Sequence, residues 1–255
     1  MRALVLSDIH GNLEALTAVL DAAGEWDVLW NLGDMVGYGA SPNEVVQTVR
    51  PLATLTVRGN HDRVCSGLTS TRNFNPTARA AAKWTMEALS AQNLEWLREL
   101  PQGPLDPEPR TQDEVRVPLA HGSPLNEDQY IQNMRDAWAP LQQMTTEITF
   151  VGHTHIQGGF AQKDHDWQEV RPRYTGREGC VSWPLAIAPG VRCLVNPGAV
   201  GQPRDFDWRA AFAIYDSTAH EVVFHRVPYD VAAAQGRVRR AGLPERLAAR
   251  LREGR

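Results

Sequence analysis

Apolar runs alternate with amphipathic segments over the first sixty residues of the chain. Three short runs are typical of buried strands, and they lie at residues 3–7, 28–32 and 54–57. Asn12 can cap a helix after the first run. Ser41 and Pro42 supply a helix cap and a first-turn proline after the second. Strands that alternate with helices in this way predict parallel βαβ units in an α/β fold.

The pattern changes after the third predicted strand. Residues 76–100 carry alanine, leucine and tryptophan at helical spacing, which predicts two helices joined near Ser90. Residues 101–114 are dense in proline and charge and predict a loop. Strands return at 115–120, 147–151, 192–195, 210–215 and 221–227. Side chains alternate in the last two, as in Ala211-Phe212-Ala213-Ile214-Tyr215, which favours antiparallel strands.

Two later segments are less regular. Glycine, proline and charge interrupt any periodicity in residues 158–189, so we expect a long connection or an irregular hairpin there. The Ala/Arg-rich tail predicts one or two short helices broken at residues 242–244, with arginines on a solvated face. The sequence shows no repeat or linker. It therefore predicts one domain over residues 1–255, with a helical insert at about 72–100 and a helical tail at about 230–255.

Composition excludes several classes of protein. The chain is 42% hydrophobic and 22% charged, as in ordinary globular proteins. Its net charge of −4 provides no overall positive field, so nucleic acid is not the expected partner. No apolar run approaches the roughly 20 residues that cross a bilayer. The N-terminus is typical of a strand rather than a signal peptide, which predicts a cytoplasmic protein without a membrane partner.

The three cysteines form no metal-binding or disulfide pattern. Their number is odd and no C-x-x-C spacing occurs, so we expect buried free thiols at Cys65, Cys180 and Cys193. No exposed apolar stripe indicates how copies of the chain would associate. The sequence is therefore compatible with a homo-oligomer as well as with a monomer.

Polar side chains with catalytic or ligand chemistry gather at the ends of predicted strands. In open α/β sheets, ligands bind at the carboxyl ends of the strands, so these groups can converge. Any one of them alone would be an ordinary cap or turn residue, but five together favour a functional site. The groups are Asp8-Ile9-His10, Gly33-Asp34, Gly59-Asn60-His61-Asp62, Ala120-His121-Gly122 and Gly152-His153-Thr154-His155.

Their spacing and chemistry indicate a metal centre. Asp8 and His10 are two residues apart, which places both side chains on one side of an extended segment, and the same holds for His153 and His155. With His61 and Asp62 set aside, the groups offer two aspartates, one asparagine and four histidines. One bridging carboxylate lets these seven fill two four-ligand sites. Imidazole and carboxylate without thiolate suit manganese, iron, zinc, cobalt or nickel.

These motifs resemble the calcineurin-like metallophosphoesterase superfamily, whose blocks D-x-H, G-D, G-N-H-[DE], H and G-H-x-H occur here in that order. The segment 196–204, Asn-Pro-Gly-Ala-Val-Gly-Gln-Pro-Arg, is similar to its small bacterial and archaeal phosphodiesterase branch, which includes diadenosine tetraphosphatase-like proteins. Ala199 stands where serine is common. The resemblance implies a four-layer α/β/β/α sandwich with a dimetal site on one rim.

The resemblance also implies the ligand sets and the cofactors. One metal ion would be held by Asp8, His10 and His155, the second by Asn60, His121 and His153, and Asp34 would bridge them. The cofactors would be two divalent transition-metal ions, with manganese as the first expectation and iron, zinc, nickel or cobalt as alternatives.

The mechanism that we hypothesise is attack of a metal-bridging hydroxide on phosphorus, in a small phosphomonoester or phosphodiester. His61 would stabilise the developing charge or protonate the leaving group. Asp62 could orient the His61 ring, although Asp34 or a backbone carbonyl could do so instead. Arg204 either binds phosphate or lies in a surface turn. Nucleotides are among the candidate substrates.

Alternatives stay open at the level of the sequence. A dinucleoside polyphosphate hydrolase, a cyclic-nucleotide phosphodiesterase and a phosphoprotein phosphatase all fit the proposed chemistry. A nuclease is less favoured, because no basic patch with interleaved aromatic residues occurs. A non-catalytic metal-binding scaffold of the same fold is the second class. Trp84 and Trp96 in the helical insert favour packing, with a lid that stacks a nucleobase as the alternative.

Overall fold

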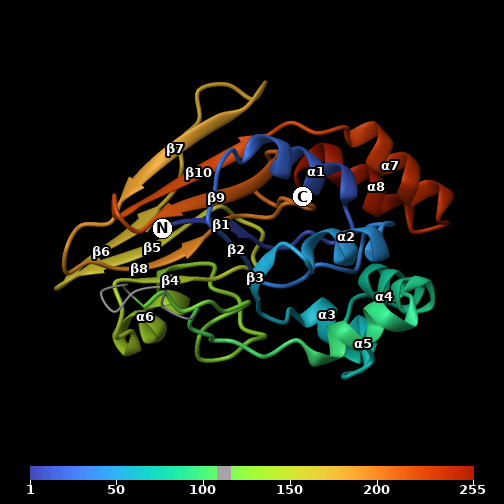
Figure 1. The fold of residues 1–255 in the computed structure, drawn as a ribbon, viewed down its shortest axis with the longest axis horizontal. Coiled ribbons are helices and arrows are strands. Elements are labelled where there is room, and N and C mark those ends of the chain that lie inside the picture. The colour runs from blue at the N-terminus through green and yellow to red at the C-terminus, as the bar shows by residue number, and fades with distance from the viewer. Residues whose placement is uncertain (108–115) are drawn as a thin grey trace.

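The computed structural model describes residues 1–107 and 116–255. Within them, two sheets lie face to face, with helices on both outer sides (Figure 1). The six-stranded sheet has the order β3-β2-β1-β9-β10-β7, and the four-stranded sheet has the order β4-β8-β5-β6. The strands are β1 (Arg2–Leu6), β2 (Val28–Asn31), β3 (Ala53–Thr56), β4 (Ile148–Phe150), β5 (Gly158–Lys163), β6 (Asp166–Val170), β7 (Val181–Ala186), β8 (Arg192–Asn196), β9 (Ala210–Asp216) and β10 (Glu221–Val227).

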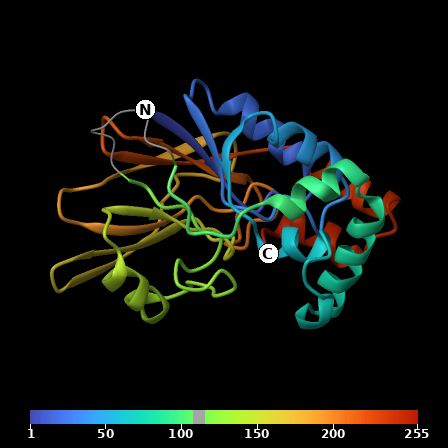
Figure 2. The same cartoon turned by 60° about the horizontal axis from the view of Figure 1, so that its bottom comes forward.

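The helices form the outer layers. Helices α1, α2 and α7 cover the six-stranded sheet, and α6 covers the four-stranded sheet. Figure 2 shows α4 and α5 on the same side of the molecule as the C-terminal helices. The helices are α1 (Leu13–Ala22), α2 (Pro42–Val49), α3 (Asn60–Cys65), α4 (Pro76–Ala88), α5 (Ala91–Glu99), α6 (Met134–Gln143), α7 (Val231–Arg240) and α8 (Glu245–Glu253). This is the α/β/β/α sandwich that the sequence predicted.

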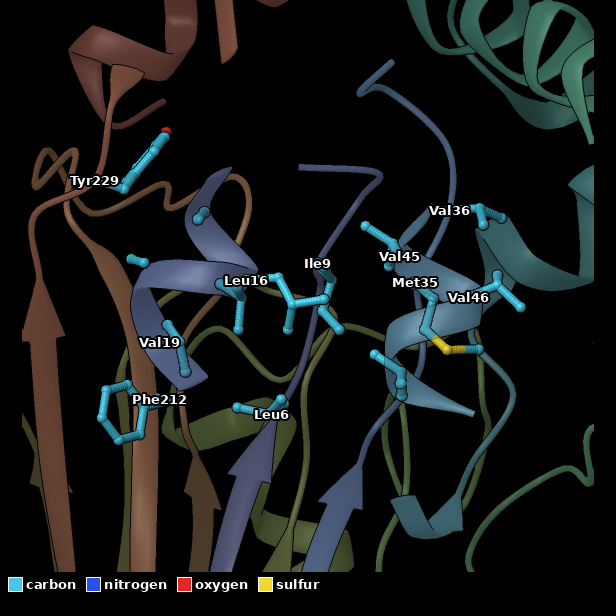
Figure 3. Packing of buried hydrophobic residues seen from close by; sticks show 14 of the residues in the cluster. Leu6, Ile9, Leu16, Val19, Met35, Val36, Val45, Val46, Phe212 and Tyr229 are labelled. Atoms are coloured by element: carbon cyan, nitrogen blue, oxygen red, sulfur yellow. The ribbon is translucent and has the colours of Figure 1, made fainter. Parts of the chain in front are cut away.

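Buried apolar side chains hold the layers together. Leu16 and Val19 of α1 pack on the outer face of the six-stranded sheet at Phe212 (Figure 3). Trp30 of that sheet meets Phe150 of the other sheet in the central layer, with ring centroids 6.3 Å apart. Burial of such large side chains stabilises a fold by about 1.5–3 kcal/mol each. The packed layers therefore fix where the carboxyl ends of the strands lie.

Most predicted elements are confirmed. Strands β1, β2 and β3 pair in parallel, and β9 and β10 pair antiparallel. Asn12 caps α1 by accepting the N–H of Ala15 at 3.1 Å. Two helices lie between residues 76 and 99 and separate at Ser90, and the tail forms α7 and α8 on either side of residues 242–244.

Residues 158–189, for which a long connection or an irregular hairpin was expected, contain β5, β6 and β7. Strands β5 and β6 form an antiparallel hairpin, so the hairpin is confirmed and the long connection is wrong. The polar composition of the segment reflects position, since β6 and β7 are edge strands and edge strands carry charge to prevent further pairing. Its glycines mark close backbone approach. A Cβ added to Gly159 would lie 2.0 Å from the carbonyl oxygen of Leu194 on the neighbouring strand.

Smaller expectations also differ from the structure. The loop and strand predicted around residues 108–115 lie outside the described residues, and residues 116–120 form only isolated bridges at Leu119. Ser41 makes no side-chain cap hydrogen bond, because its backbone leaves the usual cap conformation at ψ 51°. Cys65 and Cys193 are buried, but Cys180 is exposed just before edge strand β7.

Helices of the described residues are too short or too polar to span a membrane. Trp84 and Trp96 are partly buried against two of the apolar clusters, which matches the packing role rather than a free lid surface.

Candidate metal centre

The seven predicted ligands converge at the carboxyl ends of the strands. Asp8 and His10 follow β1, Asp34 follows β2, and His153 and His155 follow β4. Asn60 is the first residue of α3, and His121 follows the bridge at Leu119. Each of these side chains is buried apart from that of Asn60.

Their backbone conformation corrects the prediction of extended pairs. Asp8, His10 and Asp34 have φ of 54°, 48° and 54°, and His153 and His155 have φ of 67° and 62°. These are left-handed conformations, which are uncommon for residues other than glycine. Such strain concentrates at functional sites, where the surrounding structure holds it in place. The side chains therefore converge through turns rather than through strand alternation.

One cluster lies around Oδ1 of Asp8. This atom is 3.2 Å from Nε2 of His155 and 3.9 Å from Nε2 of His10. The two imidazole nitrogens are themselves 3.1 Å apart. Oδ2 of Asp34 completes the cluster at 3.6 Å from Nε2 of His10.

The second cluster lies around Nε2 of His121. This atom is 3.1 Å from Oδ1 of Asn60, 3.0 Å from Nδ1 of His153 and 3.4 Å from Oδ2 of Asp34. The same oxygen of Asp34 thus approaches both clusters. Three of these groups, Asp34, His121 and His153, have ligand atoms within 4.8 Å of one another.

The outward nitrogens of the histidines meet backbone carbonyls. Nδ1 of His10 lies 3.1 Å from O of Val36, and Nδ1 of His121 lies 2.9 Å from O of Leu32. Nδ1 of His155 lies 2.6 Å from O of Gln202. In His153 the two nitrogens exchange roles: Nε2 faces outward, 3.3 Å from O of Asp128, and Nδ1 faces the cluster. A carbonyl can only accept, so each ring donates outward, and in the neutral form of the ring the other nitrogen turns a lone pair inward.

This arrangement suits a cation. Inward lone pairs of His10 and His155 face each other at 3.1 Å, and Oδ1 of buried Asp8 accepts no hydrogen bond from the described residues. A buried carboxylate oxygen without a donor is costly unless it meets a cation. The donor set therefore fits divalent metal ions, as nitrogen and oxygen ligands without thiolate.

Charge is distributed unequally among these groups. Burial lowers the pKa of His153 to about 3 and that of His10 well below its usual value. Burial opposes the charge on His121 too, but the carboxylate of Asp34 raises its pKa to about 10. Burial would raise the pKa of Asp34, yet His121 and His61 hold it well below its usual value. Asp34 therefore carries its negative charge between the two clusters.

His61 lies beside the clusters without joining them. Its ring is 4.8 Å from that of His10, and its backbone N–H donates to Oδ1 of Asp34 at 2.7 Å. Nδ1 of His61 is buried and has no partner among the described residues. Burial lowers the pKa of this ring to about 4, so it is neutral at pH 7.

Asp62 does not orient the His61 ring, which corrects that expectation. Its Oδ2 accepts the backbone N–H groups of Asp34 at 2.8 Å and Gly59 at 3.1 Å, and its Oδ1 accepts that of Val36 at 3.2 Å. Burial raises the pKa of Asp62 to about 7, with the charge of Asp34 adding to the effect. Asp62 holds the turn that carries Asp34.

Arg204 is half-buried beside the candidate centre. Its backbone N–H donates to His155 O at 3.1 Å, and its guanidinium carbon lies 5.9 Å from the centroid of the Tyr38 ring. The sequence did not single out Tyr38, although its flanking glycines, Gly37 and Gly39, were a local signal for a tight approach. Tyr130 was also missed, and its ring stacks on His153 at 3.8 Å.

Comparison with known sequences assigns the fold and the motifs to one family. The sequence profile of the calcineurin-like phosphoesterase superfamily domain matches residues 1–219. The uncharacterized protein MJ0912 of Methanocaldococcus jannaschii is 34% identical over 256 residues, covering 98% of this chain and 97% of that protein.

Two solved structures are similar over the whole chain. A metallophosphoesterase from Sphaerobacter thermophilus is 41% identical with a TM-score of 0.81, and the match covers 100% of this chain and 99% of that one. The hypothetical protein PH1004 from Pyrococcus horikoshii is 23% identical with a TM-score of 0.77, covering 100% and 98%. The second likeness shows the fold alone.

Proposed function

The chain belongs to the calcineurin-like phosphoesterase superfamily, and from this premise we propose that it is a metal-dependent hydrolase of small phosphomonoesters or phosphodiesters. The observation that carries the proposal is the position of Asp34. Its Oδ2 lies 3.6 Å from Nε2 of His10 and 3.4 Å from Nε2 of His121, so one carboxylate oxygen serves both clusters. A carboxylate in this position could hold two ions close together, as two-metal hydrolysis requires.

The ligand sets follow from the two clusters. Asp8, His10 and His155 would hold one ion, Asn60, His121 and His153 the other, and Asp34 would bridge them. We propose manganese first, with iron, zinc, nickel and cobalt as alternatives for the same donors. Two such ions, when bound, supply a hydroxide nucleophile at neutral pH and offset charge on the phosphoryl oxygens.

His61 and Arg204 would act on the substrate. A neutral His61 can donate one ring N–H to an oxygen that gains negative charge, and its unpartnered Nδ1 leaves that capacity unused in the protein itself. His61 would stabilise charge in this way or, in its imidazolium form, protonate the leaving group. The guanidinium of Arg204, whose carbon lies 5.9 Å from the centroid of the Tyr38 ring, would bind phosphate.

The decisive experiment compares a nitrophenyl phosphomonoester with a nitrophenyl phosphodiester on chelated protein, with manganese, nickel, zinc or magnesium added back. Metal-dependent hydrolysis of either substrate supports the proposal, and the ratio of the two rates sets the substrate class. If neither substrate is hydrolysed with any metal, although the protein binds two equivalents, the result would favour a non-catalytic scaffold of the same fold. Salt-sensitive binding of DNA or RNA would favour a nuclease.

We further propose one domain over residues 1–255 and a cytoplasmic location. Limited proteolysis tests the first, because a single domain resists cleavage between residues 219 and 230, where the profile match ends and the tail begins.

A further inference from the structure

Two arginines from distant parts of the chain approach the ring of Tyr38. The guanidinium carbon of Arg204 lies 5.9 Å from the centroid of the Tyr38 ring, and that of Arg250 lies 5.6 Å from it. Arg204 follows the segment that carries Gln202, whereas Arg250 belongs to α8 at the end of the chain. Both side chains are half-buried.

Tyr38 places this pair beside the candidate metal centre. Its ring is 4.7 Å from the ring of His10 and 4.4 Å from that of His61. An anion bound by the two guanidiniums would therefore lie next to a phosphoryl group at the centre.

Helix α8 is anchored in this position. Leu247 and Ala248 are buried in the same apolar cluster as Tyr38. The N–H of Phe206 donates to the carbonyl oxygen of Gly254 at 2.9 Å, which ties the end of α8 to the loop after Arg204. Arg250 is thus held at the rim by packing and by a backbone hydrogen bond.

The pair has no acidic side chain in an ion pair with it. Among residues 1–107 and 116–255, no Asp or Glu carboxylate lies within ion-pair distance of Arg204 or Arg250, although Glu253 acts on Arg250 from farther away. Burial and the charge of Arg204 lower the pKa of Arg250 to about 10. Half-buried like charges repel each other, and an anion between them would remove that repulsion. Nε of Arg250 donates to Arg255 O, which leaves its terminal nitrogens for a ligand.

We propose that Arg204 and Arg250 bind a second phosphate group of the substrate, so that the site takes phosphoesters with a further phosphate next to the one that reacts, as in nucleoside or dinucleoside polyphosphates. This proposal rests on the proposed function. It names a residue, Arg250, that lies outside the part of the chain matched by the superfamily profile. Guanidiniums suit this role because their paired N–H groups match phosphate oxygens.

The test measures binding by calorimetry to metal-loaded protein, with two ligands in which methylene groups replace the ester oxygen at C5′ and any oxygen between phosphorus atoms. These are the phosphonate analogues of AMP and of ADP, which differ by one phosphate group. Arg250→Met keeps an unbranched side chain over Tyr38 but removes the charge, and Arg250→Lys restores a charge. Arg252→Met is the matched control, because Arg252 is exposed on the same helix.

We expect Arg250→Met to bind the diphosphate analogue about 10- to 100-fold more weakly, as for the loss of a charged hydrogen bond. Its affinity for the monophosphate analogue and its metal content should stay within twofold of the wild type. Arg250→Lys should recover part of the loss, and Arg252→Met should lose nothing. Equal weakening for both ligands, or no weakening for either, would overturn the proposal.

Failure of the proposed function looks different. If the wild type hydrolyses neither nitrophenyl substrate with any metal, the hydrolase is excluded for those substrates, but the binding comparison needs no turnover. The affinities for the two analogues then decide on the second-phosphate site without any measurement of turnover.

Discussion

The backbone N–H of His153 donates a hydrogen bond of 3.0 Å to Oδ2 of Asp8. A ligand candidate of one cluster is therefore oriented by the peptide of a ligand candidate of the other. Ser7 adds a second donor to the same oxygen at 2.6 Å. With Oδ2 held by two donors, Oδ1 of Asp8 is left to face the first cluster.

This relationship depends on Gly152. A Cβ at that position would lie 2.0 Å from Oγ of Ser7 and 3.1 Å from Oδ2 of Asp8. Gly152→Ala should therefore displace both groups, and we expect loss of bound metal from both clusters, measured by elemental analysis after dialysis. Gly236→Ala, on helix α7, is the control and should keep the wild-type content. Full metal content in Gly152→Ala would show that Asp8 does not need this support.

Asp34→Asn should weaken both metal sites at once. The amide keeps the shape of the side chain but removes the charge that lies between His10 and His121. We expect the protein to retain fewer than two equivalents of manganese under conditions in which the wild type retains two. Asp21→Asn, at an exposed position, serves as the control. Unchanged metal content in Asp34→Asn would refute the bridging assignment.

His61→Ala should separate catalysis from metal binding. The ring touches neither cluster through a ligand atom, so both metal equivalents should remain. Turnover should fall roughly 10²–10⁴-fold, the usual range when a positioned donor or acid is removed. The matched control is His165→Ala, since His165 is exposed in the turn between β5 and β6. A loss of metal that parallels the loss of activity would instead make His61 a ligand.

Asp62→Ala should destabilise the fold before any metal binds. The carboxylate accepts three backbone N–H groups, and each buried donor left without an acceptor costs about 1–3 kcal/mol. We expect a lower denaturation midpoint in urea for the chelated protein. Asp62→Asn keeps one oxygen acceptor and should lose less. If the midpoint of Asp62→Ala equals that of the wild type, the turn is held by other contacts.

The convergence of these side chains was predictable from the sequence because parallel strands deliver their carboxyl ends to one edge. That topological rule needs only the order of strands and the residues that follow them. The geometry of each ligand was not predictable in the same way. His10 and His155 take left-handed conformations that are set by the turns around them, and no periodicity in the sequence encodes such a turn.

Edge strands and tertiary contacts account for other differences. Strand β6 lies at a sheet edge, where selection for charge removes the apolar alternation that would have identified it. The sequence predicts a solvated helix face for the arginines of the tail, including Arg250. Its contact with Tyr38 is not predictable from local sequence, because the two residues are more than two hundred positions apart in the chain. Contacts of that range depend on how α8 packs, which local sequence does not specify.

His225 provides a pH-dependent test outside the metal centre. Its ring stacks on Phe212 with centroids 4.6 Å apart, and burial, followed by the charge of Arg2, lowers its pKa to about 4. The unfolded chain protonates this histidine near pH 6.5, whereas the folded protein does so only near pH 4. The neutral ring therefore contributes stability that is fully present above pH 6.5 and is lost as the pH falls toward 4.

His225→Gln should remove this contribution to the acid sensitivity. The free energy of unfolding of the chelated protein is measured by urea denaturation between pH 7.5 and 4. As the pH falls, it should decline more steeply in the wild type than in the variant, by the uptake of up to one additional proton on unfolding. Buried histidines of the metal centre titrate in both proteins, so the comparison cancels them. Identical pH profiles would mean that solvent reaches the His225 ring in the folded state and that its pKa is not lowered.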